Sequence, residues 1–160
     1  MPAKSKTSLL DVNALAIYLV EDHPGHPYVA PIIDAGLAGR ASLLAPDQLP
    51  LRARWVMTTR WKLPKKDVDD ALKDFLEQPR VSYVGADRAT LGRAFLLAQA
   101  LRHDVYDTYY LALALKHEAT GLLTTDGAFQ KLCKEVGLEY ENPVPTSVLK
   151  RFQAYRPTGR

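Results

Sequence analysis

Residues 103–126, with the sequence HDVYDTYYLALALKHEATGLLTTD, decide the fold. Val105 to Glu118 is apolar almost all round, which predicts a buried helix packed on a sheet. Gly121 to Thr125 follows within a residue or two and has the character of a buried strand. A helix with so short a connection ends at the edge of the sheet where the next strand begins. Its first turn, with Asp104 and Asp107, therefore lies at the opposite edge, where that strand ends.

Two more acidic residues reach this edge. Thr7 to Asp11 is predicted to be a buried strand that ends in a carboxylate, and the strand from Gly121 leads directly to Asp126. The carboxyl ends of parallel strands form the crevice in which open α/β sheets bind their ligands. Clustered aspartates are typical ligands of a hard cation. We therefore expect Asp11, Asp104, Asp107 and Asp126 to lie close together and to hold a cation.

The rest of the chain alternates between strands and helices. This alternation predicts a three-layer α/β/α fold with a central, mainly parallel sheet of four to five strands. No long linker or repeat divides the chain, so we expect a single domain over residues 1–160. The other expected strands are 41–45, 81–84 and 138–140. Six further helices are expected: one that ends near Arg40, one over 51–62, one after Pro64, one after Asp87, one that starts at Asp126, and one over 146–155.

Composition limits the class of protein. The 160 residues are 47% hydrophobic and 24% charged, as in ordinary globular proteins, and the net charge of +3 is compatible with a nucleic-acid partner. Cys133 is the only cysteine, so no intrachain disulfide forms, and we expect a cytoplasmic protein. No apolar run approaches the ~20 residues that span a bilayer, so no membrane association is expected. A Gly-rich phosphate loop and a nucleophile–histidine pair are both missing, which disfavours NTPase and acyl-transfer chemistry.

Three motifs, in this order, resemble those of the PIN-domain ribonucleases, and most closely the VapC-type toxins. They are Asp11-Val12-Asn13, Tyr106-Asp107-Thr108 and Leu122-Leu123-Thr124-Thr125-Asp126, and the resemblance extends from about Ser8 to Phe129. It implies a PIN-like fold and endoribonuclease activity with Mg²⁺ or Mn²⁺. It also implies a homodimer and an antitoxin partner. Asp11, Asp107 and Asp126, assisted by Asp104, would be the catalytic metal ligands, and Asn13 and Thr124 would orient them.

One position departs from the family pattern. Relatives carry a second acidic residue, usually glutamate, early in the helix after the second strand, and Arg52 stands there in this chain. A guanidinium at this place would compete with the cation or grip an RNA phosphate. Asp104 lies one helical turn before Asp107 and is placed to supply the missing carboxylate. The chain is therefore either a ribonuclease with a variant metal site or a PIN-fold RNA-binding or protein-interaction domain with weak or absent activity.

Several of these residues have simpler structural interpretations. Asp104, Asp107 and Asp126 each stand where an aspartate caps a helix. Zinc binding by His23 and His26 is disfavoured, because two ligands do not make a structural site. A set of aromatic residues fits RNA stacking, the core or a dimer interface: Trp55, Trp61, Tyr109 and Tyr110. A set of basic residues fits phosphate contacts or a solvated face: Arg52, Arg54, Arg60, Lys62, Lys65 and Lys66.

Overall fold

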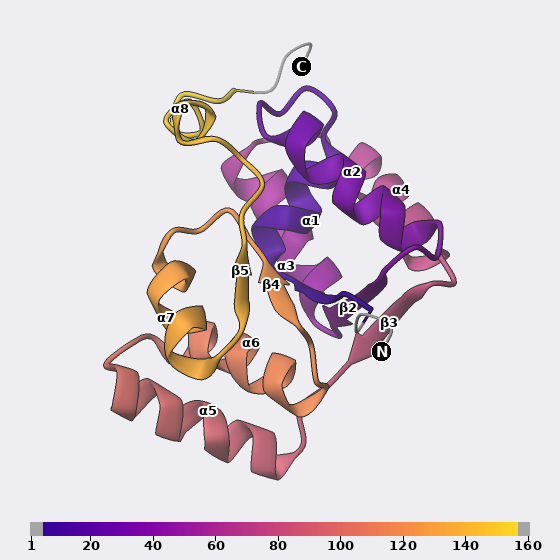
Figure 1. The fold of residues 1–160 in the computed structure, drawn as a ribbon. Coiled ribbons are helices and arrows are strands. Elements are labelled where there is room, and N and C mark those ends of the chain that lie inside the picture. The colour runs from indigo at the N-terminus through magenta and orange to yellow at the C-terminus, as the bar shows by residue number, and fades with distance from the viewer. Residues whose placement is uncertain (1–4, 157–160) are drawn as a thin grey trace.

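A five-stranded parallel sheet forms the centre of the molecule, in the order β3-β2-β1-β4-β5 (Figure 1). The computed structural model describes residues 5–156. All four strand pairings are parallel, which confirms the predicted fold class. The strands are β1 (Thr7–Leu10), β2 (Ser42–Pro46), β3 (Val81–Val84), β4 (Gly121–Leu123) and β5 (Glu139–Glu141).

Helices cover both faces of the sheet, so the architecture has three layers. Alternate strand residues serve the two faces: Leu10 and Leu43 join one buried cluster, and Leu9 and Leu122 join the other. The first face carries α1 (Val12–Leu19), α2 (His26–Leu37), α3 (Leu49–Trp55), α4 (Lys65–Leu76) and α8 (Thr146–Leu149). The second face carries α6 (Val105–Lys116) and α7 (Ala128–Val136), and α5 (Arg88–Leu101) packs against α6.

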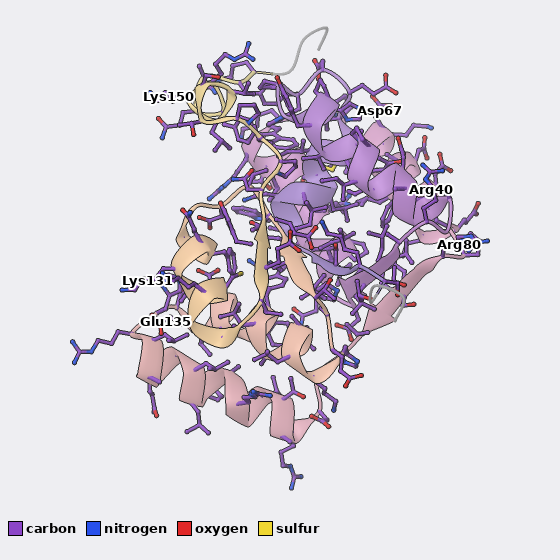
Figure 2. All side chains as sticks on the ribbon, in the orientation of Figure 1. Arg40, Asp67, Arg80, Lys131, Glu135 and Lys150 are labelled. Carbon is purple, nitrogen blue, oxygen red and sulfur yellow. The ribbon has the colours of Figure 1, made fainter. Side chains whose placement is uncertain are left out.

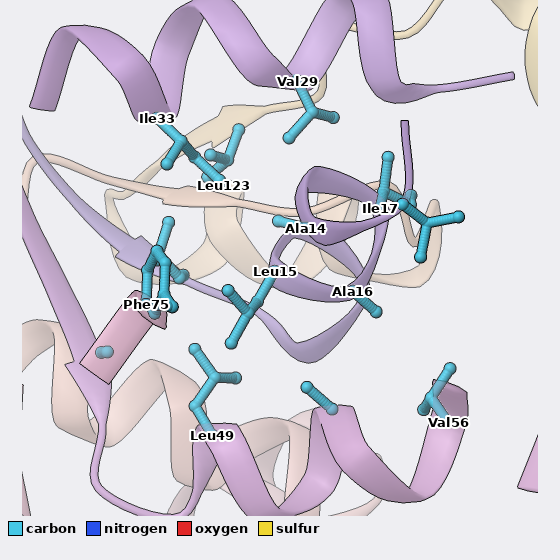
Figure 3. Close-up of a cluster of buried hydrophobic side chains, with 14 of the residues drawn as sticks. Ala14, Leu15, Ala16, Ile17, Val29, Ile33, Leu49, Val56, Phe75 and Leu123 are labelled. Carbon is cyan, nitrogen blue, oxygen red and sulfur yellow. The ribbon is translucent and has the colours of Figure 1, made fainter. Parts of the chain in front are cut away.

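Helix α1 fills the centre of the first face. Ala14, Leu15 and Ile17 are fully or almost fully buried and meet Ile33 of α2 and Leu49 of α3 in one cluster (Figure 3). Each fully buried leucine or isoleucine side chain in this cluster stabilises the fold by about 1.5–3 kcal/mol. The sequence did not reveal α1 as a separate helix, because only Asp11 stands between it and β1, and this one residue both follows the strand and caps the helix.

Helix α7 has the amphipathic pattern of a helix that covers a sheet edge. Phe129 and Cys133 are buried against the second face, whereas Lys131 and Glu135 point outward from the helix (Figure 2). Burial raises the pKa of the Cys133 thiol to about 11, so this cysteine is an inert apolar core residue.

Two predicted helices differ from the observed ones. The helix expected over 51–62 is α3 followed by a π-helical turn, Val56–Arg60. The helix expected over 146–155 ends at Leu149, and Phe152 and Tyr155 then pack their rings against His23. This aromatic contact holds the end of the described chain on the first face and replaces further helical turns. Within residues 5–156, no helix is long and apolar enough to cross a bilayer.

Candidate metal and nucleic-acid site

Asp11 is the innermost residue of the candidate site. It follows β1 directly, and its backbone N–H donates to the carbonyl of Leu123 at 3.0 Å, so the sheet ladder holds it in place. Its carboxylate caps α1, with Oδ1 accepting from the Val12 N–H at 2.7 Å. Although it is charged, Asp11 is only 4% exposed. Burying a carboxylate so deeply is costly unless hydrogen bonds or a cation compensate for the lost water.

Thr124 connects Asp11 to Asp126. Its hydroxyl donates to Asp11 Oδ2 at 2.7 Å and accepts from the Asp126 N–H at 3.0 Å. The Asp126 carboxylate then accepts from the Ala128 N–H at 2.9 Å, which fixes it at the start of α7. The Thr124 hydroxyl therefore orients both acidic residues: it binds the carboxylate of Asp11 and the backbone N–H of Asp126.

Asp107 reaches the site from the first turn of α6. Its Oδ2 lies at hydrogen-bond distance, 2.7 Å, from His103 Nε2. His103 stands just before the Asp104 cap of α6, four residues from Asp107, and this spacing at a helix start is the sequence signal that could have found the contact. Asp104 behaves differently: it is exposed, and its carboxylate caps α6 by accepting from the Tyr106 N–H at 2.7 Å.

A cleft of about 660 Å³ opens at this edge of the sheet. Of the four acidic residues predicted to converge, Asp11, Asp107 and Asp126 line it, together with Asn13. Asp104 does not line it, since its carboxylate is committed to the helix cap. Within residues 5–156, no three acidic, histidine or cysteine side chains are gathered tightly enough to hold a metal ion as they stand. The carboxylates are instead held by the local hydrogen bonds described above.

The electrostatics of the cleft centre on Asp11. Its pKa is raised to about 6, mainly because burial removes water from the carboxylate, and further because Asp126 and Asp107 place negative charge nearby. The hydrogen bonds from Thr124 and Val12 oppose this rise. Desolvation is thus the larger cause of the raised pKa, and repulsion from the neighbouring acids is the smaller one. In the described part of the chain, no lysine or arginine forms an ion pair with these three aspartates.

Arg52 lies in α3, the helix after the second strand, and lines the same cleft. Its guanidinium carbon is 5.5 Å from the centre of the Tyr106 ring, a cation–π distance, and the residue is exposed. Among the described residues it has no acidic ion-pair partner. Arg52 therefore stands at the rim of the cleft as an available positive charge.

Trp55 and Arg60 are cleft residues to which the sequence assigned no definite role. Trp55 is 55% exposed, and the Arg60 guanidinium carbon lies 5.6 Å from the centre of its ring. Trp61 by contrast packs on His23 and Tyr155. The His23 ring is buried among these aromatic rings, and burial lowers its pKa to about 4, so it belongs to the core.

Comparison with known proteins agrees with this geometry. The PIN domain family matches residues 8–135. The chain belongs to the PIN domain family. The sequence of this PIN domain has no significant match among curated proteins.

The fold of this PIN domain is also found among solved structures. The crystal structure of VapC20 from Mycobacterium tuberculosis, a toxin that cleaves the Sarcin-Ricin loop, aligns with a TM-score of 0.61. The alignment covers 78% of this chain and 93% of VapC20, at 13% sequence identity. It confirms the predicted PIN-like fold, and the family match places the chain in a family of nucleases.

Proposed function

We propose that this protein is a divalent-metal-dependent endoribonuclease that hydrolyses RNA phosphodiester bonds in the cleft between Asp11, Asp107 and Asp126. The observation that carries the proposal is that three separate elements bring these carboxylates to one cleft, where no lysine or arginine of residues 5–156 forms an ion pair with the buried Asp11. A buried carboxylate whose pKa stays raised despite two hydrogen bonds, beside two other acids, is the environment that a small divalent cation relieves.

The residues present fit Mg²⁺ or Mn²⁺ by their chemistry. Carboxylate oxygens are the donors that these hard ions prefer, and Asn13 adds an amide to the same cleft. Asp11, Asp107 and Asp126 would hold the ion, which would acidify a bound water and stabilise the leaving oxygen. Asp104 has no direct place in this arrangement, because its carboxylate caps α6 outside the cleft.

The chain's own groups prepare the site for hydrolysis. Thr124 and the Val12 N–H hold the Asp11 carboxylate in one orientation, so that little reorganisation is needed when the substrate binds. His103 holds Asp107 through Nε2 at 2.7 Å and so fixes the orientation of that carboxylate. Water supplies the attacking oxygen, so no protein nucleophile is required.

The test compares two variants that each remove one negative charge, at positions three residues apart at the start of α6. Asp107→Asn removes a cleft carboxylate and should lower Mn²⁺-dependent RNA cleavage more than about 100-fold. Asp104→Asn makes the same change of charge and keeps a good helix cap, so it should retain most of the activity. Equal cleavage by both variants, or equal loss, would contradict the assignment of the cleft.

The likeness of the fold to VapC20 supports a more specific role. We propose that the protein is the toxin of a toxin–antitoxin pair, acting in the cytoplasm as a homodimer. Expression of the chain alone should then arrest growth of a bacterial host, and co-expression of the protein encoded beside its gene should restore growth. Asp107→Asn should abolish the arrest. Arrest by this variant as strong as by the unmodified chain would contradict a nuclease toxin.

One observation favours a second candidate function. Arg52 stands where the resemblance to the family places an acidic ligand, and the acidic side chains are not gathered around one point in the described structure. Both features suit a PIN-fold domain that binds RNA, or a protein partner, without cleaving. RNA binding without cleavage in Mg²⁺ or Mn²⁺ would support this candidate over the first.

A further inference from the structure

Trp55 is a large apolar side chain exposed in the wall of the acidic cleft. Its ring is 55% exposed, and it shares the cleft with Asp11, Asp107 and Asp126. The other tryptophan, Trp61, has aromatic neighbours that cover it. An exposed indole in a functional cleft indicates a surface that a ligand covers.

The π-helical turn after α3 brings a positive charge onto this ring. Five residues of an α-helix span 500°, so Arg60 would point about 140° away from Trp55 if α3 continued regularly. In the π-helical turn a backbone N–H donates to the carbonyl five residues earlier, as the Trp61 N–H does to the Val56 carbonyl. The turn therefore holds one more residue than an α-helical turn, and Arg60 comes to lie near Trp55. The Thr58 hydroxyl binds the Arg54 carbonyl at 2.8 Å, a contact that bends helices.

Four basic residues of this region form two contrasting pairs. Arg54 pairs with Asp69 at 2.6 Å and Lys66 pairs with Asp70 at 2.7 Å, so both are neutralised by acids of α4. Arg52 and Arg60 line the cleft, lie against aromatic rings, and have no ion-pair partner within the described residues. Their charge is therefore available to an anionic ligand.

A second pair of the same kind continues the surface. Tyr106 is 64% exposed beneath Arg52, in a neighbouring groove of about 270 Å³ that shares Arg52 and Tyr110 with the cleft. A chain lying across both hollows meets an arginine and an aromatic face twice. Stacked faces with nearby guanidinium groups suit alternating bases and phosphates better than they suit an apolar protein segment.

We propose that Trp55 stacks on an unpaired base of the RNA substrate while Arg60 contacts an adjacent phosphate. This inference rests on the proposed function, and it specifies that the substrate is single-stranded at the cleft. Bases inside a duplex have both faces covered by their neighbours and offer none to the indole. Trp55 is thus a positioning and specificity-determining residue that lines the same cleft as the acids.

The experiment measures RNA binding in EDTA, where cleavage cannot proceed. In a Trp61→Phe background Trp55 is the only indole, so its fluorescence reports contact directly. A single-stranded RNA decamer should quench this fluorescence, and a decamer of the same length without bases should not. Trp55→Ala should weaken binding of the labelled decamer by roughly 5- to 150-fold, and Trp55→Phe should retain most of it.

Two control variants separate stacking and charge from general effects. Leu96→Ala removes another exposed apolar side chain, 66% exposed on α5, and should leave binding unchanged. Arg60→Gln should lower the slope of log affinity against log salt by about 0.7, as expected for one lost contact to a single strand. Arg40→Gln, which changes an exposed arginine between α2 and the start of β2, should not change the slope.

Three outcomes would overturn the stacking proposal. They are unchanged affinity in Trp55→Ala, no quenching by the bound decamer, or quenching that depends on protein concentration alone, which would mark Trp55 as a contact between two copies of the chain. Binding and quenching without any cleavage in Mn²⁺ would leave stacking intact and refute the nuclease proposal. Cleavage that requires Asp107 and is unchanged in Trp55→Ala would support the nuclease proposal and refute the stacking proposal.

Discussion

The Asp11 carboxylate is 4% exposed, and its folded pKa of about 6 lies above the model-peptide value of 3.8. Well below pH 3.8 the group is protonated in both states and costs nothing. As pH rises through about 6, the folded state holds the proton longer, so stability falls and remains lower above that pH. At a little over 1 kcal/mol per pKa unit, the full cost is about 3 kcal/mol.

Asp11→Asn should remove this pH-dependent cost. In EDTA at pH 8 we expect the variant to be about 1–2 kcal/mol more stable, since the lost hydrogen bond to charge offsets part of the gain. At pH 4 the advantage should disappear. Urea unfolding at both pH values measures it, with the surface variant Asp70→Asn as a control that changes little. A variant that is less stable by the same amount at both values would show that the carboxylate is needed for its cap alone.

Arg52→Glu tests whether this residue stands in the place of an acidic ligand. The guanidinium is exposed, so screening reduces its effect to the order of 1 kcal/mol, and we expect the substitution to tighten Mn²⁺ binding by about fivefold or more. RNA binding in EDTA should weaken, because a contact to phosphate is lost. Arg40→Glu makes the same change of charge at the far edge of the sheet. Unaltered Mn²⁺ affinity in Arg52→Glu would mean that Arg52 does not occupy the acidic position.

At the scale of single residues, the sequence predicted the acids of strand ends better than those of helix starts. Asp11 and Asp126 follow apolar strands, so connectivity alone places them at one edge. Asp104 and Asp107 are three residues apart at one helix start, and the sequence could not show that one is committed to the cap. The pairing of Arg60 with Trp55 was hidden because it depends on a π-helical turn.

At the scale of elements, two helical glycines in different surroundings test the packing of the layers. A Cβ on Gly36 of α2 would lie 2.3 Å from Leu43 of β2, whereas a Cβ on Gly92 of α5 would meet nothing within 4 Å. Gly36→Ala should therefore destabilise the protein by about 1–3 kcal/mol. Gly92→Ala should stabilise it by about 0.5–1 kcal/mol, since alanine is the better helix former. Thermal unfolding compares them, and equal effects would contradict the packing of α2 on β2.

Elements with strong hydrophobic periodicity and clear boundaries were predictable. Helix α4 has its apolar stripe and Pro64 before it, and α5 begins at the Asp87 cap, whose carboxylate accepts from the Thr90 N–H at 2.9 Å. Helix α1 and the short α8 were not predictable, because contacts with distant residues decide their extent. The aromatic packing of Phe152 and Tyr155 on His23 is such a contact.

At the scale of the whole molecule, one connection determined most of the architecture. The short link from α6 to β4 fixes the direction of that helix, and parallel pairing brings the ends of β1 and β4 to the same edge. The order of the strands did not follow from the sequence, since it depends on which neighbours each strand pairs with. The side-chain orientations in the cleft were equally out of reach, because hydrogen bonds between distant residues set them.

The central claim is that Asp11, Asp107 and Asp126 together hold a divalent cation. Anomalous diffraction from crystals grown with Mn²⁺ tests it most directly. We expect one or two peaks in the cleft, within roughly 2–2.5 Å of oxygens of these three residues, and no peak there in Asp11→Asn crystals. An empty cleft at a Mn²⁺ concentration that supports RNA cleavage, or a peak bound elsewhere in the molecule, would contradict the claim.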